Sequence, residues 1–216
     1  MAILNSLSVR NRSILEISIE IISILFYIWF LEHHSPDAVR AIFFWAICVG
    51  FPIFCIAREQ NRFPEFSLDW TSMKKSTKSI GAFTLISTVS LAIIGLAINN
   101  MRFDEFFYTR LAEYFFWAFL QQVGVQMFLT RRAQKIFKNH YAVSGLVATV
   151  FALIHFPNPP LLAFTWIGGF FWSYSFQSVP NLYTLAISHG WCAVIAYYAI
   201  PQSWIHHLKV GPTYFH

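Results

Sequence analysis

Long apolar runs alternate with short polar segments along most of this chain. A helix needs about 20 mostly apolar residues to cross the hydrocarbon core of a bilayer, and these runs are close to that length. The pattern therefore predicts an all-α fold, a polytopic transmembrane bundle of about seven helices. The predicted spans are residues 13–31, 41–57, 82–98, 106–129, 141–156, 160–178 and 182–200. The polar stretch 58–80 is expected to lie on the membrane surface as an amphipathic segment.

The composition supports a membrane protein and excludes a soluble one. Apolar residues make up 56% of the 216 residues and charged residues only 12%, roughly half the charged fraction of a typical globular domain. So few charges cannot cover so much apolar surface in water. Three cysteines without a CxxC pair argue against both a disulfide framework and a structural zinc site.

The basic residues lie between the predicted spans, so the net charge of +5 reports topology rather than affinity for nucleic acid. By the positive-inside rule the N-terminus is cytoplasmic, and we expect an integral protein of a bacterial inner membrane. The first span follows Arg10 and Arg12, is interrupted by Glu16 and Glu20, and lacks a cleavage signature, which favours an uncleaved helix over a signal peptide. The other basic residues of the predicted cytoplasmic segments are Arg58, Arg62, Lys74, Lys75, Lys78, Arg131, Arg132, Lys135 and Lys138.

The fourth span holds most of the polar residues found inside apolar runs. Arg110 and Glu113 are three residues apart, so they can pair on one helix face. Gln122 and Gln126 are four apart and share a face, with Gln121 about 100° to one side. Because polar side chains are costly in a bilayer, three glutamines within six residues predict a polar cavity.

Two histidines in later spans point to the same cavity. His155 lies one turn before the Pro-Asn-Pro-Pro sequence that contains Asn158, and His189 lies well inside the last span. Such a pair can ligate haem, hold a metal together with Glu113, or assist water without any metal. The depths of the two histidines along their helices differ, and the usual HExxH zinc signature is absent, so we expect neither a metal nor a cofactor.

The order of these elements resembles the CAAX protease and bacteriocin-processing (CPBP) family of intramembrane glutamic peptidases. The family carries EExxxR, FxxxH and HxxxN on successive core helices. The second motif is intact here as Phe151-Ala-Leu-Ile-His155, and His189 fits the third. The first aligns with Gln121-Gln122-Val-Gly-Val-Gln126, in which glutamine replaces both glutamates and the arginine at unchanged spacing.

Two further positions bear on the resemblance, which covers about residues 110–200. Gly168-Gly169 is similar to the glycine-bearing helix between the family's second and third motifs, and Ala193 stands where the third motif usually has asparagine. The resemblance implies a chain divided into N-terminal helices with a cytoplasmic loop (1–105), a CPBP-like core (106–200) and a C-terminal tail (201–216).

The resemblance also implies an activity, cleavage of a membrane-anchored protein or peptide near its terminus, with the lipid bilayer as the surroundings. The expected catalytic residues are His155, His189, Glu113, Gln121 and Gln122, and the expected substrate-binding residues are Gln126, Phe151 and Asn158. A glutamine cannot accept a proton as the family glutamate does. The base is then Glu113 or one of the histidines, or the protein is an inactive relative that binds or scaffolds a partner. The sequence does not name the substrate.

Overall fold

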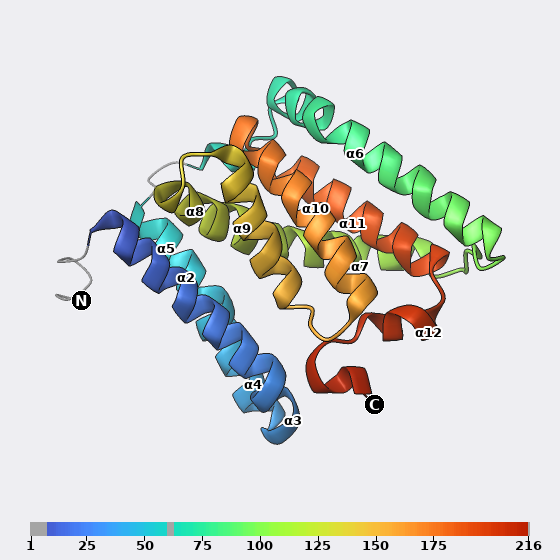
Figure 1. Ribbon diagram of the computed structural model, residues 1–216, viewed down its shortest axis with the longest axis horizontal. Helices are drawn as coiled ribbons and strands as arrows, with labels where there is room; N and C mark the ends of the chain where they lie inside the picture. The colour runs from blue at the N-terminus through green and yellow to red at the C-terminus, as the bar shows by residue number, and fades with distance from the viewer. Residues whose placement is uncertain (1–7, 60–62, 216) are drawn as a thin grey trace.

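The computed structural model describes residues 8–59 and 63–215, and within this part of the chain every regular element is a helix (Figure 1). Arg62, one of the basic residues of the predicted cytoplasmic segments, lies outside the described residues. The all-α membrane bundle predicted from the sequence is confirmed. Seven long helical runs are present in the described residues, and each contains most or all of one of the seven predicted spans.

The first two runs form an antiparallel pair, which we call the N-terminal hairpin (residues 9–59). Each run contains a wider π-helical turn, and Pro36 lies in the break between the two runs. The elements of the hairpin are α2 (Val9–Phe26), η1 (Tyr27–Leu31), α3 (Glu32–His34), α4 (Asp37–Phe43), η2 (Phe44–Val49) and α5 (Gly50–Glu59).

The remaining runs pack as a bundle beside the hairpin. Figure 1 shows α6, α11, α10 and α9 in sequence across the molecule, with α7 passing behind them. The elements are η3 (Pro64–Phe66), α6 (Trp70–Ala97), α7 (Phe107–Gln122), η4 (Val123–Thr130), α8 (Arg131–Ile136), α9 (His140–Leu153), α10 (Pro159–Ser178), α11 (Leu182–Ala199), α12 (Gln202–Ile205), η5 (His206–Leu208) and η6 (Gly211–Phe215).

Two helical runs, the third and the fourth, extend furthest beyond their predicted bounds. The third run starts at Trp70 because Asp69 caps it, its side chain accepting from the Ser72 amide at 2.9 Å. The basic stretch at its start is therefore helical, and the expected surface segment is reduced to η3 and its flanks. The fourth run continues through η4 and α8 to Ile136, where its basic residues meet acids of the hairpin.

Within residues 8–59 and 63–215, three helices have the length and apolar composition to cross a membrane: Val9–His34, Asp37–Glu59 and Trp70–Ala97. Their outward side chains are large and apolar; Leu85, Ile86 and Ile93 of α6, for example, are all more than 60% exposed. Such a surface needs lipid around it. The chain is an integral membrane protein.

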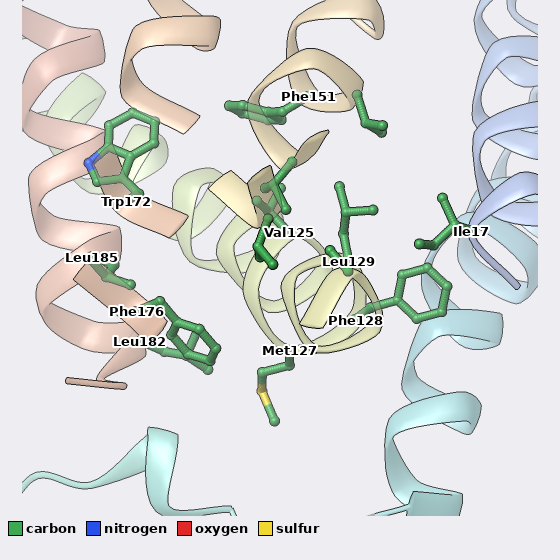
Figure 2. Close-up of a cluster of buried hydrophobic side chains, with 14 of the residues drawn as sticks. Ile17, Val125, Met127, Phe128, Leu129, Phe151, Trp172, Phe176, Leu182 and Leu185 are labelled. Atoms are coloured by element: carbon green, nitrogen blue, oxygen red, sulfur yellow. The ribbon is translucent and has the colours of Figure 1, made fainter. Parts of the chain in front are cut away.

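Small and hydroxyl residues bring the bundle helices close together, as is usual in membranes. A Cβ added at Gly190 of α11 would lie 3.1 Å from the Cα of Phe115 on α7, so any larger residue would push the two helices apart by a few tenths of an ångström. Hydroxyl pairs join α6 to α11, including Thr84 to Ser188 at 2.7 Å. Figure 2 shows the apolar core between the helices, from Ile17 of α2 past η4 to the side chains of α10 and α11.

The C-terminal segment, expected as a separate tail, packs against the bundle. Ile205 is fully buried, and the Gly211 amide donates to the Phe156 carbonyl at 2.9 Å. Figure 1 shows this segment below α9 and α10, beside the end of the hairpin formed by α3 and α4. The tail therefore takes part in the wall of the cavity described next.

Candidate functional site

The three glutamines of the fourth span lie at the junction of α7 and η4. Gln121 and Gln122 end α7, and Gln126 lies within the π-helical turns of η4. Such wide turns are frequent at functional sites. Gln122 and Gln126 are fully buried, whereas Gln121 is only partly buried and lines a cavity.

Gln122 and Gln126 belong to a continuous buried chain of hydrogen bonds. Gln126 Nε2 donates to Gln122 Oε1 at 2.9 Å, and Thr130 Oγ1 donates to Gln126 Oε1 at 2.9 Å. At one end Thr130 lies 3.1 Å from the hydroxyl of Ser173, and at the other Gln122 Nε2 lies 3.2 Å from His189 Nδ1. An amide nitrogen only donates, so His189 Nδ1 accepts and its neutral ring carries the hydrogen on Nε2.

Aromatic rings fix the position of His189. The indole of Trp172 stacks on its imidazole with a centroid distance of 4.2 Å, and Trp172 Nε1 donates to the Ser188 hydroxyl at 3.0 Å. The Phe151 ring lies edge-on to His189 at 5.8 Å and to His155 at 5.0 Å. Phe151 thus contacts the rings of both histidines.

His155 has one ring nitrogen available for a ligand. Its Nδ1 lies 2.7 Å from the Phe151 carbonyl. A carbonyl oxygen only accepts, so Nδ1 carries the hydrogen and Nε2 keeps a free lone pair. The imidazole lines the same cavity as Gln121.

This cavity has a volume of about 570 Å³ and lies between the N-terminal hairpin and the core helices α7, η4 and α9. The tail closes part of it through Leu208 and Val210. Most of its lining is aliphatic or aromatic, which suits a hydrophobic chain or a membrane-embedded peptide segment. Gln121 and His155 supply the polar groups on the core side.

The structure thus divides the five residues expected in one polar cavity into two groups. Gln121 and His155 face the cavity, whereas Gln122, Gln126 and His189 lie behind it in the buried hydrogen-bonded chain. The two groups meet through Phe151, which lines the cavity and contacts both histidines.

Two further predicted site residues lie elsewhere. Glu113 is exposed and absent from the described lining of the cavity. The spacing allows it to pair with Arg110, but the ion pair that the structure shows for Arg110 is with Asp104, at 3.1 Å from Nη2. Asn158 is fully buried, and its amide donates to the carbonyls of Ile205 and Lys209 at 2.8 and 3.1 Å. Because both of its hydrogens are bound to the tail, Asn158 has a structural role here rather than one in substrate binding.

Glu20 is a cavity residue that the motif pattern does not predict. It lines the cavity from the hairpin side, on α2, and is only 7% exposed. An acid in the middle of an apolar span is costly in a bilayer and is therefore a signal of function. In the sequence Glu20 bears only on the signal-peptide question, because no pattern along the chain connects α2 with the motifs about 100 residues later.

Comparison with known proteins agrees with the motif pattern. The family model described as Type II CAAX prenyl endopeptidase Rce1-like matches residues 103–195, which include all three motif positions. Residues 103–195 are therefore similar to the CPBP family, and we call them the CPBP domain. No curated protein and no solved structure matches the chain. The N-terminal hairpin, α6 and the tail lie outside the matched residues, so the cavity is formed partly by the CPBP domain and partly by elements beyond it.

Proposed function

We propose that the protein is an intramembrane endopeptidase of the CPBP type that cleaves a membrane-anchored protein or peptide near its terminus. The observation that carries this proposal is the cavity at which motif one and motif two meet, with Gln121 and the free Nε2 of His155 in an otherwise apolar lining. An apolar cavity accommodates a lipid-linked or membrane-embedded chain, and Gln121 and His155 offer an amide bond in it a donor and an acceptor.

Each group has a role that its chemistry allows. His155 Nε2 accepts a hydrogen bond from the attacking water, and the Gln121 amide donates to the carbonyl oxygen that becomes negatively charged. Gln122 and His189 position the site without lining the cavity. Their hydrogen bond holds the end of α7 in place, and the Phe151 ring packs against both His189 and His155. In hydrolysis, water oxygen bonds to the carbonyl carbon, the C–N bond breaks, and the leaving nitrogen gains a proton.

The test is cleavage by the full-length protein in liposomes. The probes are a fluorogenic prenylated CAAX peptide and membrane-anchored tails of proteins encoded beside this gene. Wild type should cleave at least one of them, and His155→Ala should lower the rate by about 10²–10⁴-fold, the range for loss of a group that assists proton transfer. If wild type is inert and Gln121→Glu gains cleavage, the native protein binds rather than cuts, and the proposal is wrong.

A further inference from the structure

The CPBP domain has no acid at motif one, and Glu113 does not face the cavity. Among the described residues that line the cavity, the carboxylates come from the N-terminal hairpin alone: Glu20 in the middle of α2, and Glu32 in α3 at the far end of the first run. Peptide hydrolysis requires a group that takes a proton from water, which an amide cannot do. Besides the imidazole of His155, a carboxylate that replaces the family's glutamate is therefore to be sought on the hairpin.

Glu20 differs sharply from its neighbour Glu16, one helical turn earlier. Glu16 is bound by Arg58 and Arg132, each at 2.7 Å. Glu20 is only 7% exposed, yet its Oε2 has no hydrogen-bond partner among the described residues. A buried carboxyl left without a partner is costly, so such a residue needs an explanation. Its position in the cavity wall supplies one, since a ligand or water in the cavity can bind it.

Successive contacts place Glu20 beside motif one. Glu16 binds Arg132, whose guanidinium also donates to the Phe128 carbonyl at 3.4 Å. Just beyond the end of α2, Tyr27 of η1 packs on Phe44 of η2, which stacks on Trp117 of α7. The first run from Glu16 to Tyr27 therefore follows the fourth run in the opposite direction, from Phe128 back to Trp117.

Glu20 lies one turn, about 6 Å, beyond Glu16. One turn before Phe128 is Gly124, and three residues before that is Gln121. A Cβ added at Gly124 would meet nothing within 4 Å, so the space in front of this part of η4 is open. Glu20, Gly124 and Gln121 all line the cavity, and no side chain at position 124 separates the carboxyl group from Gln121.

We propose that Glu20 is the proton acceptor of this site and replaces the motif-one glutamate from a helix outside the CPBP domain. This inference rests on the proposed peptidase function. An O–H bond of the attacking water breaks and its proton moves to the Glu20 carboxylate, while the oxygen bonds to the carbonyl carbon. When the C–N bond breaks, Glu20 returns the proton to the leaving nitrogen. One water is consumed, and a carboxylic acid and an amine are released.

The experiment measures kcat and KM for the cleaved probe in liposomes with wild type, Glu20→Gln and Glu20→Asp. Glu20→Gln keeps the size of the side chain and should lower kcat by about 10²–10⁴-fold with little change in KM. Glu20→Asp should keep part of the activity and alter the acid side of the pH–rate profile. Glu105→Gln removes an exposed carboxylate outside the described cavity lining and serves as the matched control.

A double variant separates a chemical role from a structural one. Glu20→Gln combined with Gln121→Glu returns a carboxylate to the cavity on the core side, and it should recover activity if Glu20 only supplies the proton acceptor. Equal rates for wild type and Glu20→Gln would overturn the inference, as would loss of activity in Glu113→Gln or Glu32→Gln alone. Those outcomes leave the peptidase function intact. A wild type that cleaves no probe while Gln121→Glu does contradicts both proposals.

Discussion

At the scale of single residues, the glutamines of motif one form a neutral version of a charged arrangement. The family motif has two glutamates and an arginine where this chain has Gln121, Gln122 and Gln126. Gln122 and Gln126 hydrogen-bond each other and are both fully buried. Burying neutral amides avoids the large cost of desolvating charges, and each amide offers both a donor and an acceptor. The hydrogen bond to His189 of α11 is thus kept without charge, while the carboxyl groups of the described cavity lining come from Glu20 and Glu32 of the hairpin.

Asp104, in the loop before α7, gives a prediction on pH. The Tyr198 hydroxyl donates to it at 2.6 Å and Arg110 binds its other oxygen at 3.1 Å. The hydrogen bond from Tyr198, supported by the Phe106 amide and Arg110, holds the pKa of the Asp104 carboxyl below its usual value. A lowered folded-state pKa means that Asp104 stabilises the fold at pH values above the unfolded pKa of about 3.9 and loses this effect as the pH falls through the folded value.

Asp104→Asn should therefore unfold at a lower temperature than wild type at pH 7, and the difference should shrink as the pH is lowered below about 4. Thermal unfolding in detergent across pH 3–8 measures it. The effect should be small because Asp104 is partly exposed and screened by salt. A difference that grows toward acid pH would show that the sign is wrong.

At the scale of elements, asparagines decide where three helices begin. Asn139, Asn158 and Asn181 cap α9, α10 and α11, each accepting from backbone amides of the first turn. Asn158 does more than cap, because its amide hydrogens bind the tail carbonyls of Ile205 and Lys209. One side chain therefore fixes both the start of α10 and the tail that closes part of the cavity.

Replacing Asn158 tests this double role. Asn158→Ala loses the cap, about 1 kcal/mol, and two hydrogen bonds of about 1 kcal/mol each, so the free energy of unfolding should fall by about 2–3 kcal/mol. Asn158→Asp keeps the acceptor for the cap but loses the donors to the tail. Its free energy of unfolding should lie between those of wild type and Asn158→Ala. Limited proteolysis of the tail should be faster in both variants. If protease cuts the tail of both variants at the wild-type rate, the hydrogen bonds from Asn158 do not hold the tail in place.

At the scale of the whole molecule, an ionic clamp holds the N-terminal hairpin to the core. We define this clamp as Glu16 and Arg58 with Glu59, Arg132 and Lys135, which join α2, α5 and α8. Glu16 and Arg132 are almost completely buried. Near the other end of the cavity, Trp29 of the hairpin stacks on Phe156 with a centroid distance of 6.0 Å, and the tail packs on Ile28. The cavity lies between these two attachments.

Breaking the clamp on one side should be costly. Glu16→Gln leaves the buried Arg132 without its nearest carboxylate, and loss of one partner of a buried pair typically costs about 3–5 kcal/mol. The double variant Glu16→Leu/Arg132→Met removes both charges and should regain most of that loss, since apolar replacements of buried pairs are often neutral. Thermal unfolding in detergent compares the two. A double variant no more stable than Glu16→Gln would contradict this account.

Local signals in the sequence determined a large part of this structure. The seven helical runs follow from apolar length, because the bilayer requires about 20 apolar residues per span and helical hydrogen bonds satisfy the backbone without outside partners. The family resemblance followed from spacing within single helices, since Gln121, Gln122 and Gln126, Phe151 and His155, and His189 keep their motif positions whatever the helices pack against.

Only the tertiary structure decided which polar groups share a space. Glu20 and Gln121 are about 100 residues apart, and nothing along the chain indicates that α2 faces η4. The same holds for Asn158, whose partners in the tail lie nearly 50 residues later, and for Arg110, which binds Asp104 although Glu113 is closer in sequence. Helix periodicity determines which face a residue lies on, but the rotation and partner of that face are set by packing against distant helices, through contacts that no local pattern encodes.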